Sequence, residues 1–544
     1  MCHNCRSPAQ AALSEANGLE MTTHDVAVIG SGFAGSLLAR ILARLGYAVV
    51  LLERGTHPRF AIGESTTPLA NLSLERISRR YGLDDCYDLA AHGRWLRAHP
   101  ELRRGLKRGF TFYRHHPGQH LDAAERLLVA ASPTAEVSDS HWMRSDVDEH
   151  FVRAAVAAGV DYRDRVELVR ATIDDRGARL SGVRDDAAFT LDVEYVVDAS
   201  GPGGFLARQL GIPSGLDRAR THSAILFSHF EGTRPMADIM PQLPPGPYPD
   251  DWAAMHHVID EGWMYVLRFD DGVVSAGFAL SPRGLASLPS SIVGDPDAMW
   301  QCLMGRYPTI AATFAGARPL MPLVYRPRVQ HRLTQAAGER WAMLPHAYAF
   351  TDALFSTGIA WGLRGIERLA LAFEDTTLRR PSASTRRRYD QLLSAEADQI
   401  DTLVAGAYEA MAHFDLFAAH ALIYFSTVSY AEAYQRLVAR DSDVAAWSGF
   451  LGVGDPHLES LPGESYRRLQ QKVRIPRSAR DDYVTWVQSA IGPRNICGFG
   501  DPARRHLYPV DLDLLVERHD LLSLTREDLV AALPALRGFQ VMPS

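Results

Sequence analysis

A glycine-rich turn between two apolar strands constrains this chain more than any other feature. From His24 the sequence reads HDVAVIGSGFAGSLLARILARLGYAVVLLE, which predicts a strand, a turn, a helix with an apolar period near 3.6 and a second strand. In such a βαβ unit Gly30 permits the tight turn, Gly32 lets backbone approach a pyrophosphate, and Gly35 allows close helix-strand packing. Glu53 ends the second strand, where an acid can accept a hydrogen bond from a ribose hydroxyl. We therefore predict a dinucleotide site, and the glycine spacing alone leaves NAD and FAD open.

The composition excludes several other classes of protein. With 544 residues, of which 47% are hydrophobic and 22% charged, the chain resembles ordinary globular proteins. A net charge of −7 gives no electrostatic footprint for nucleic acid, so we expect no nucleic-acid partner. No apolar run is long enough to span a membrane, and the polar N-terminus lacks the apolar core of a signal peptide. Five scattered cysteines predict no disulfide framework and no metal site, so we expect a cytoplasmic protein.

Three later segments narrow the choice of dinucleotide. They are Gly63 to Pro68, reading GESTTP, a predicted helix with Arg144 at its start, and the turn Asp198-Ala-Ser-Gly201 after an apolar strand. This order resembles the FAD-binding fold of flavoprotein monooxygenases, in which an Asp-Ala-x-Gly turn and a matching arginine contact the cofactor. The resemblance implies FAD and an α/β, Rossmann-like fold of that type, with an inserted β-rich substrate region and a helical C-terminal region.

Two further motifs sharpen the resemblance to flavin-dependent halogenases. Gly63 to Pro68 looks like that family's G-E-S/A-T-x-P segment, and Phe355-Ser-Thr-Gly-Ile359 looks like its S-T-G-I run. Lys107-Arg-Gly-Phe-Thr-Phe112 is similar to the K-x-G-F element of members that act on phenols or carrier-bound aromatics. The resemblance, over about residues 21 to 375, implies that reduced FAD, oxygen and a halide ion (chloride or bromide) yield hypohalous acid, which reaches a lysine beside the substrate. It also implies a separate flavin reductase and an electron-rich small aromatic substrate (a phenol, pyrrole or indole), free or bound to a carrier protein.

The resemblance makes Lys107 the expected catalytic residue. The expected cofactor-binding residues are Gly30, Gly32, Phe33, Ala34, Gly35, Glu53, Arg54, Glu64, Ser65, Thr66, Arg144, Asp198, Gly201, Asp352, Thr357, Gly358 and Ile359.

The use of lysine in this chain supports a special role for Lys107. Of 57 basic residues only two are lysines, Lys107 and Lys472. Arginine serves as the surface cation everywhere else, but it cannot offer a compact titratable amine. The alternating residues after Lys107 predict a half-buried strand, in which an amine is partly desolvated. The alternative is a solvated lysine within the basic run of residues 103 to 108.

Two departures from the family pattern keep other functions open. Halogenases usually carry W-x-W-x-I-P, thought to restrict ordinary monooxygenation, whereas this chain has Tyr265 after Trp263. An aromatic hydroxylase of the same fold is therefore an alternative, and a non-catalytic flavin-binding module is a third. Phe355 stands where tryptophan-specific members have a glutamate, so we expect no carboxylate against the lysine and a substrate other than free tryptophan. His346 lies where related flavoproteins have a polar Asp or Asn near FAD.

The organisation of the chain follows from these motifs and from one boundary. Residues 1–20 are expected to be a disordered tail or a misassigned start, and residues 21–380 a composite FAD-binding and substrate-binding domain. A Pro-Ser-Ala-Ser-Thr segment flanked by arginines marks the start of a mostly helical region, residues 381–544. We expect its aromatic residues Phe414, Phe417, Tyr424 and Phe425 to pack the core, with contact to the substrate pocket as the alternative. We expect His115, His116 and His120 to form a surface cluster and not a metal site.

Overall fold

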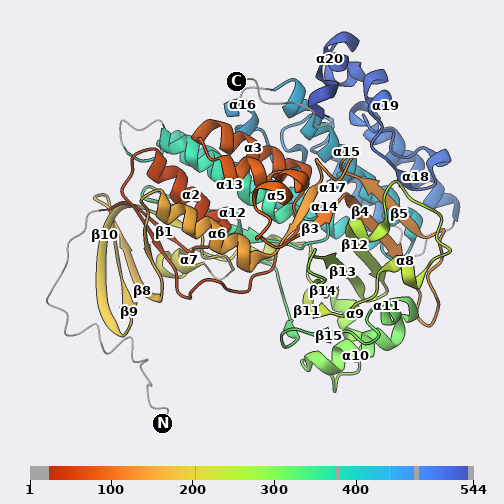
Figure 1. Ribbon diagram of the computed structural model, residues 1–544, viewed down its shortest axis with the longest axis horizontal. Coiled ribbons are helices and arrows are strands. Elements are labelled where there is room, and N and C mark those ends of the chain that lie inside the picture. Colours follow the sequence, from red (N-terminus) through yellow and green to blue (C-terminus); the bar gives the residue numbers. More distant parts are fainter. Residues whose placement is uncertain (1–23, 203, 375–378, 440–441, 471–476, 537–544) are drawn as a thin grey trace.

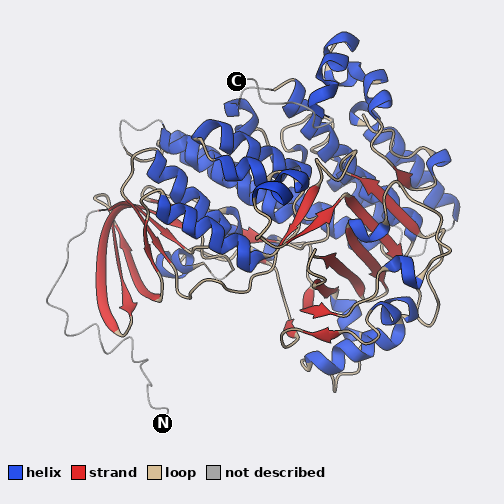
Figure 2. Ribbon diagram, viewed as in Figure 1, coloured by secondary structure: helices blue, strands red, loops and turns tan. Residues whose placement is uncertain are grey.

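Two β-sheets joined by helices form the frame of the molecule (Figure 1). The computed structural model describes residues 24–202, 204–374, 379–439, 442–470 and 477–536. The predicted tail and Lys472 lie outside these ranges. Figure 2 shows the two groups of strands with helices packed above and between them.

The first sheet is built around the glycine turn. Its order is β7 (Asp161–Arg163), β2 (Val49–Leu52), β1 (His24–Ile29), β10 (Ala187–Asp198), β9 (Ala178–Arg184) and β8 (Val166–Ile173), with β18 (Trp341–Met343) paired to β10. Strands β7, β2, β1, β10 and β18 run parallel, and Ile29 lies opposite both Leu52 and Asp198. Because parallel strands end at the same edge, the turns after β1, β2 and β10 meet there, which is where ligands bind in such sheets.

The predicted βαβ unit is confirmed in order and position. Helix α2 (Phe33–Arg44) links β1 to β2 and buries one apolar face. It packs against α6 (Arg144–Ala157) and α13 (Thr357–Glu374), and α13 packs in turn against α3 (Pro68–Tyr81). The chain leaves α2 through Gly46, whose φ of +87° suits glycine. The predicted Rossmann-like α/β class is therefore correct.

The second sheet is the predicted β-rich insertion. Its order is β15 (Arg318–Pro319), β11 (Ala224–Glu231), β14 (Val274–Leu280), β13 (Gly262–Arg268), β12 (Ala254–Ile259), β4 (Gly109–Arg114), β5 (Arg126–Ala130) and β20 (Leu507–Tyr508), with β16 (Val324–Arg326) paired to β11. The short helices beside it are α8 (Met236–Ile239), α9 (Pro282–Ala286), α10 (Pro296–Arg306) and α11 (Pro308–Thr313), at the lower right of Figure 1. Strands β3 (Arg104–Lys107) and β6 (Asp139–Trp142) form a separate antiparallel pair.

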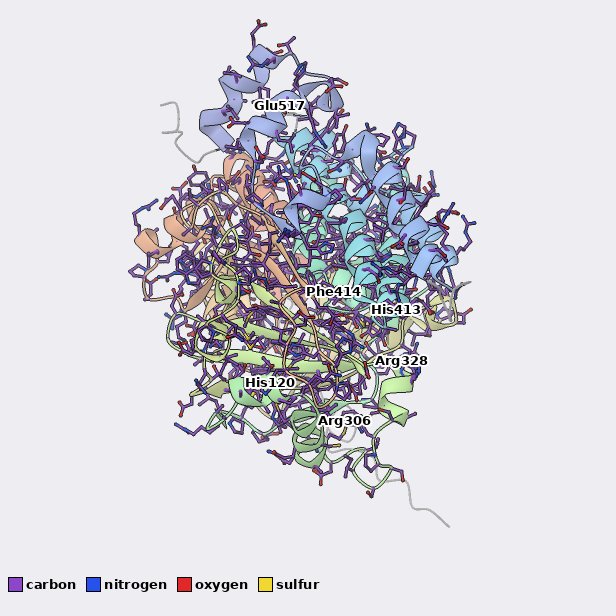
Figure 3. The ribbon with its side chains drawn as sticks, turned by 90° about the vertical axis from the view of Figure 1, so that its right-hand side faces the viewer. His120, Arg306, Arg328, His413, Phe414 and Glu517 are labelled. Atoms are coloured by element: carbon purple, nitrogen blue, oxygen red, sulfur yellow. The ribbon has the colours of Figure 1, made fainter. Side chains whose placement is uncertain are left out.

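The C-terminal region is mostly helical, as predicted. It comprises α14 (Ala383–Ala410), α15 (Phe414–Leu437), α16 (Ser442–Trp447), α17 (Leu461–Gln470), α18 (Arg477–Ile491), α19 (Leu512–Glu517) and α20 (Arg526–Leu536). Ser382 caps α14, since its hydroxyl accepts a hydrogen bond from the Thr385 N–H at 3.2 Å. In Figure 3, Glu517 of α19 lies at the top, Arg306 of α10 at the bottom, and Phe414 between them. A domain boundary at residue 381 stays a prediction.

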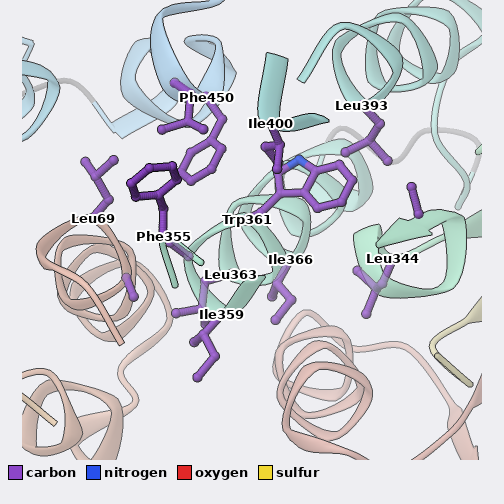
Figure 4. Close-up of a cluster of buried hydrophobic side chains, with 14 of the residues drawn as sticks. Leu69, Leu344, Phe355, Ile359, Trp361, Leu363, Ile366, Leu393, Ile400 and Phe450 are labelled. Carbon is purple, nitrogen blue, oxygen red and sulfur yellow. The ribbon is translucent and has the colours of Figure 1, made fainter. Parts of the chain in front are cut away.

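Helix α13 is the place where the N-terminal and C-terminal parts meet. Its residues Trp361, Leu363 and Ile366 pack in one apolar cluster with Ile400 of α14 (Figure 4). Within this cluster the Trp361 indole donates to the Glu396 carboxylate at 2.8 Å. Because α13 begins with the S-T-G-I run, this packing fixes the direction from which that run enters the site.

Candidate functional site

The glycine turn is held by main-chain contacts. Gly30 has a φ of +103°, and a Cβ there would lie 2.6 Å from the Ala199 carbonyl oxygen. A Cβ on Gly35 would lie 2.0 Å from the Gly30 carbonyl oxygen. Real Cβ atoms are not tolerated at such distances, so both positions require glycine for packing.

Gly32 is different, because it faces open space. The atoms nearest to a Cβ built on Gly32 belong to the side chains of Arg144, Arg59 and Asp148, each 3.7 Å away. The space therefore lies at the N-terminus of α2 with two guanidinium groups beside it. Helix N–H groups and arginines suit a pyrophosphate, and the missing Cβ lets it come close. The residues present fit an FAD pyrophosphate, as the sequence predicted.

Glu53 is held as a carboxylate at the end of β2. It accepts hydrogen bonds from the Ser31 N–H at 3.0 Å, the Ser31 hydroxyl at 2.8 Å and the Gly55 N–H at 2.9 Å. Burial opposes its ionisation, but Arg59 and these hydrogen bonds lower the pKa of Glu53 overall. An ionised acid at this place can accept a ribose hydroxyl. Arg54, which follows, is exposed.

Arg144 ties three segments of the site together. Its guanidinium donates to both Asp148 oxygens at 2.9 and 3.0 Å and to the carbonyls of Ile62 and Gly63 at 2.9 and 3.0 Å. It also lies over the Phe33 ring, 5.0 Å from the centroid. Ala34, the next residue, is half-buried on α2. Arg144 thus joins α6 to the loop before the GESTTP segment.

Asp198 shapes the turn that follows β10. Its carboxylate accepts from the Ser200 N–H at 2.9 Å, the Ser200 hydroxyl at 2.6 Å and the Leu206 N–H at 2.8 Å. Burial raises its pKa, and these hydrogen bonds oppose the rise. Gly201 has a φ of +71°, and no atom lies within 4 Å of a Cβ built on it. Asp198 therefore holds the turn, and Gly201 presents open backbone at the same edge as Gly32.

The GESTTP segment runs between the cofactor edge and β6. The Glu64 carboxylate accepts a hydrogen bond from the His229 Nε2 at 2.7 Å. The N–H and the hydroxyl of Thr66 both donate to the Ser140 carbonyl of β6, at 3.1 Å and 2.9 Å. The Ser65 hydroxyl is buried and has no hydrogen-bond partner among the described residues. This unsatisfied oxygen suits a ligand or water on the cofactor side.

The S-T-G-I run turns sharply into α13. Ser356 has a φ of +51°, and Thr357 and Gly358 form the first turn of α13, while Ile359 is buried. A Cβ on Gly358 would lie 3.0 Å from the His346 ring, and burial lowers the pKa of His346 to about 4. A neutral imidazole therefore fills the place where related flavoproteins have an Asp or Asn.

Asp352 faces away from the glycine turn. Its carboxylate accepts from the Ser223 hydroxyl at 2.7 Å, the Tyr408 hydroxyl at 3.0 Å and the Leu354 N–H at 3.0 Å. Tyr408 in turn accepts from the Trp263 indole at 3.0 Å. The contacts of Asp352 connect the S-T-G-I loop to the second sheet. A direct role of Asp352 in cofactor binding stays a prediction.

Lys107 is completely buried at the end of β3. Its Nζ donates to the Thr66 carbonyl at 2.5 Å and lies 4.0 Å from the centroid of the Phe110 ring. Directly opposite, in the register of β3 with β6, lies Asp139, which is 2% exposed. Burial lowers the pKa of Lys107, and the Asp139 carboxylate opposes that shift. A desolvated amine is thus placed beside the GESTTP segment.

Four expectations about this region are corrected by the structure. The solvated-lysine alternative is wrong, because Lys107 is 0% exposed. We expected no carboxylate against the lysine, but Asp139 supplies one from β6; sequence reasoning missed it because the pairing joins residues 32 positions apart. Strand β4 is buried on both faces instead of half-buried, because helices cover the side we expected to be open. His115 is buried and shares a hydrogen bond with His257 at 2.9 Å, so it is not part of a surface cluster.

A cavity of about 200 Å³ lies beside two neighbours of Lys107, although Lys107 is not itself one of the lining residues. Its wall includes Phe110, Asp139 and, from α15, Tyr424 and Phe425. We expected these two aromatic residues to pack the core, with contact to the substrate pocket as the alternative. They are buried and also line the cavity, whereas Phe417 packs on Phe112 at a centroid distance of 5.4 Å. The C-terminal region therefore closes the cavity.

Among the described residues, every helix is too short or too polar to cross a lipid bilayer.

Known proteins resemble this chain in both sequence and fold. A family model described as an FAD binding domain matches residues 23–238. The tetracycline 7-halogenase of Kitasatospora aureofaciens is 31% identical over 404 residues, which cover 72% of this chain and 71% of that protein. Monodechloroaminopyrrolnitrin halogenase PrnC of Pseudomonas fluorescens is 28% identical over 413 residues, covering 75% of this chain and 71% of PrnC. The crystal structure of halogenase PltM with phloroglucinol and FAD matches with a TM-score of 0.81 and 24% identity over 89% of this chain and 99% of that one, a likeness of fold.

Proposed function

This chain belongs to the family of flavin-dependent halogenases, and from that premise we propose that it halogenates a small, electron-rich aromatic molecule held in the cavity beside Lys107. The protein is an FAD-dependent oxidoreductase that uses a halide. One observation carries the proposal: the buried amine of Lys107 donates to the Thr66 carbonyl of the GESTTP segment and lies over the ring of Phe110. Phe110 in turn lines an aromatic cavity, so it links the lysine to that cavity.

The volume of the cavity supports a substrate of about one ring. An engineered apolar cavity of about 150 Å³ binds benzene, so about 200 Å³ accommodates a substituted phenol or pyrrole and, with little room to spare, an indole. PltM, whose structure holds phloroglucinol, is named with a ligand of this class. We propose a free substrate, because the cavity can enclose a whole ring.

The residues of the site have separate roles. The Gly32 turn and Arg144 would hold the pyrophosphate of FAD, and Glu53 its ribose. When it is bound and reduced, FAD would supply, together with oxygen, the oxidation of the halide ion to hypohalous acid. Lys107 then positions the electrophile beside the ring. A bond forms between halogen and ring carbon, the oxygen-halogen bond breaks, and water leaves with the displaced ring hydrogen.

We also propose that a separate flavin reductase supplies the reduced FAD, in the cytoplasm. The chain carries one dinucleotide fingerprint, and that one is assigned to FAD. Stopped-flow mixing of the FAD-loaded enzyme with NADH should therefore leave the flavin oxidised. Rapid bleaching by NADH alone would place the protein with the single-component hydroxylases.

The mass of the product tests the proposed reaction. We expect phloroglucinol, offered with chemically reduced FAD, oxygen and bromide, to gain bromine in place of hydrogen. Omitting bromide should leave it unchanged. A product that carries only an added oxygen would overturn the proposal in favour of the hydroxylase alternative.

A further inference from the structure

Asp139 is a buried carboxylate for which the reaction above has no role. Its Oδ1 accepts a hydrogen bond from the Asn71 amide at 2.8 Å. Its Oδ2 is covered from solvent and has no hydrogen-bond partner among the described residues. A buried carboxylate oxygen without a donor is costly, so such an oxygen points to a partner from outside the chain.

The other acidic residues of the cavity wall are already paired. Glu75 accepts hydrogen bonds from Arg94 at 2.9 Å and from Arg436 at 2.8 Å. Glu432 accepts from the Nε of Arg436 at 2.8 Å, and Asp511 accepts from Arg504 at 2.7 Å. Asp139 lines the same cavity, and among the described residues it has no arginine in contact. Its opposite charge is Lys107, across the β3–β6 pair, whose Nζ donates to Thr66. Asp139 Oδ2 therefore stays without a donor in a wall whose other acids are paired.

We propose that Asp139 recognises the hydroxyl or ring N–H of the substrate, and that its Oδ2 accepts that hydrogen bond and takes up its proton during halogen transfer. This inference rests on the proposed function and adds a requirement that the substrate carry a donor. As the O–H proton moves to Oδ2, the ring gains electron density and its carbon attacks the halogen of hypohalous acid. The carbon-halogen bond forms and the oxygen-halogen bond breaks. The released hydroxide takes the displaced ring hydrogen and leaves as water, and Asp139 returns its proton to the substrate oxygen.

The test compares phenol with toluene, which has nearly the same shape but no donor. Calorimetric titration of the FAD-loaded, oxidised enzyme gives both dissociation constants without any turnover. For wild type we expect phenol to bind about tenfold or more tightly than toluene, as a hydrogen bond to a charged group implies. Asp139→Asn keeps the Oδ1 acceptor for Asn71 but replaces Oδ2 by an amide donor, so the preference should fall to about twofold or less.

A matched control and a second variant keep the result interpretable. Asp250→Asn makes the same change at a partly buried carboxyl in the short turn before β12, paired with Arg126 at 3.2 Å, and should leave the preference intact. If Asp139→Asn does not fold because Lys107 loses its opposite charge, the double variant Lys107→Met with Asp139→Asn removes both charges. The binding measurement does not need Lys107.

Three results would decide the inference. A preference for phenol that survives in Asp139→Asn, or in the double variant, overturns it. A wild type that binds phenol and toluene equally also overturns it, even if that enzyme halogenates phloroglucinol. Conversely, loss of the preference in Asp139→Asn but not in Asp250→Asn supports it, and this holds whether the product of turnover is brominated or hydroxylated.

Discussion

The glycine turn of residues 30–35 and the buried pair of Lys107 with Asp139 lie on opposite sides of the GESTTP segment, and they are built in different ways. The turn consists of six consecutive residues, and its tight contacts are to main-chain atoms such as the Ala199 and Gly30 carbonyls. The pair joins two short strands that are distant in sequence, and its side chains contact other segments, Lys107 the Thr66 carbonyl and Asp139 the Asn71 amide. Substitutions in the turn should therefore affect folding and cofactor binding, whereas substitutions in the pair should affect chemistry in a folded protein.

The largest expected effect is a folding defect at Gly35. In Gly35→Val the new Cβ would lie 2.0 Å from the Gly30 carbonyl oxygen, in a backbone contact that cannot move aside. We expect a loss of about 3 kcal/mol or more in the free energy of unfolding, or insoluble protein. The matched control is Gly305→Val in α10, where no atom lies within 4 Å of an added Cβ. Urea denaturation measures both, and a Gly35→Val protein as stable as the control would contradict this reading of the turn.

Gly32 should separate cofactor binding from folding within the same turn. Because the nearest atoms to its Cβ position are side-chain atoms 3.7 Å away, an ordinary contact distance, Gly32→Val should fold normally. Its two added methyl groups enter the space assigned to the pyrophosphate, so we expect FAD to bind about tenfold or more weakly, about 1.4 kcal/mol. Fluorescence titration with FAD checks this, with Gly305→Val as control. Unchanged affinity in a folded Gly32→Val protein would show that the cofactor does not lie against this turn.

A smaller effect is expected on the pH dependence of halogenation. A neutral amine can accept a hydrogen bond from hypohalous acid, whereas an ammonium cannot. Burial lowers the pKa of Lys107 from its ordinary value of 10.5. The rate should therefore rise with pH, with a midpoint below that value. The Asp139 carboxylate favours the ammonium form, so Asp139→Asn should move the midpoint to lower pH still. Bromination rates measured from about pH 6 to about pH 10, roughly two units on either side of the Lys107 pKa of about 8, give both midpoints. A midpoint that stays in place or moves up would contradict the assigned coupling.

The two regions also differ in how much of them could be predicted from the sequence. The positions of β1, α2 and β2, the turn glycines and Glu53 follow from local spacing, because the residue pattern that specifies them lies within one βαβ unit. The burial of Lys107 was suggested by the scarcity of lysine, but its partner was not. Asp139 faces Lys107 only through the β3–β6 register, and Tyr424 reaches the cavity only through packing of α15. Such placements depend on tertiary contacts, which local spacing does not reveal.

The most direct test of the account is whether Lys107 is needed for halogen transfer but not for the reaction of reduced flavin with oxygen. Lys107→Arg keeps the charge but replaces a compact amine with a planar guanidinium that cannot hold hypohalous acid in the same way. Wild type, Lys107→Arg and the control Lys472→Arg are each given chemically reduced FAD, bromide and phloroglucinol, and oxygen uptake and brominated product are measured in the same sample. We predict that Lys107→Arg consumes oxygen normally and forms no brominated product, while Lys472→Arg behaves as wild type. Normal bromination by Lys107→Arg would contradict the central assignment.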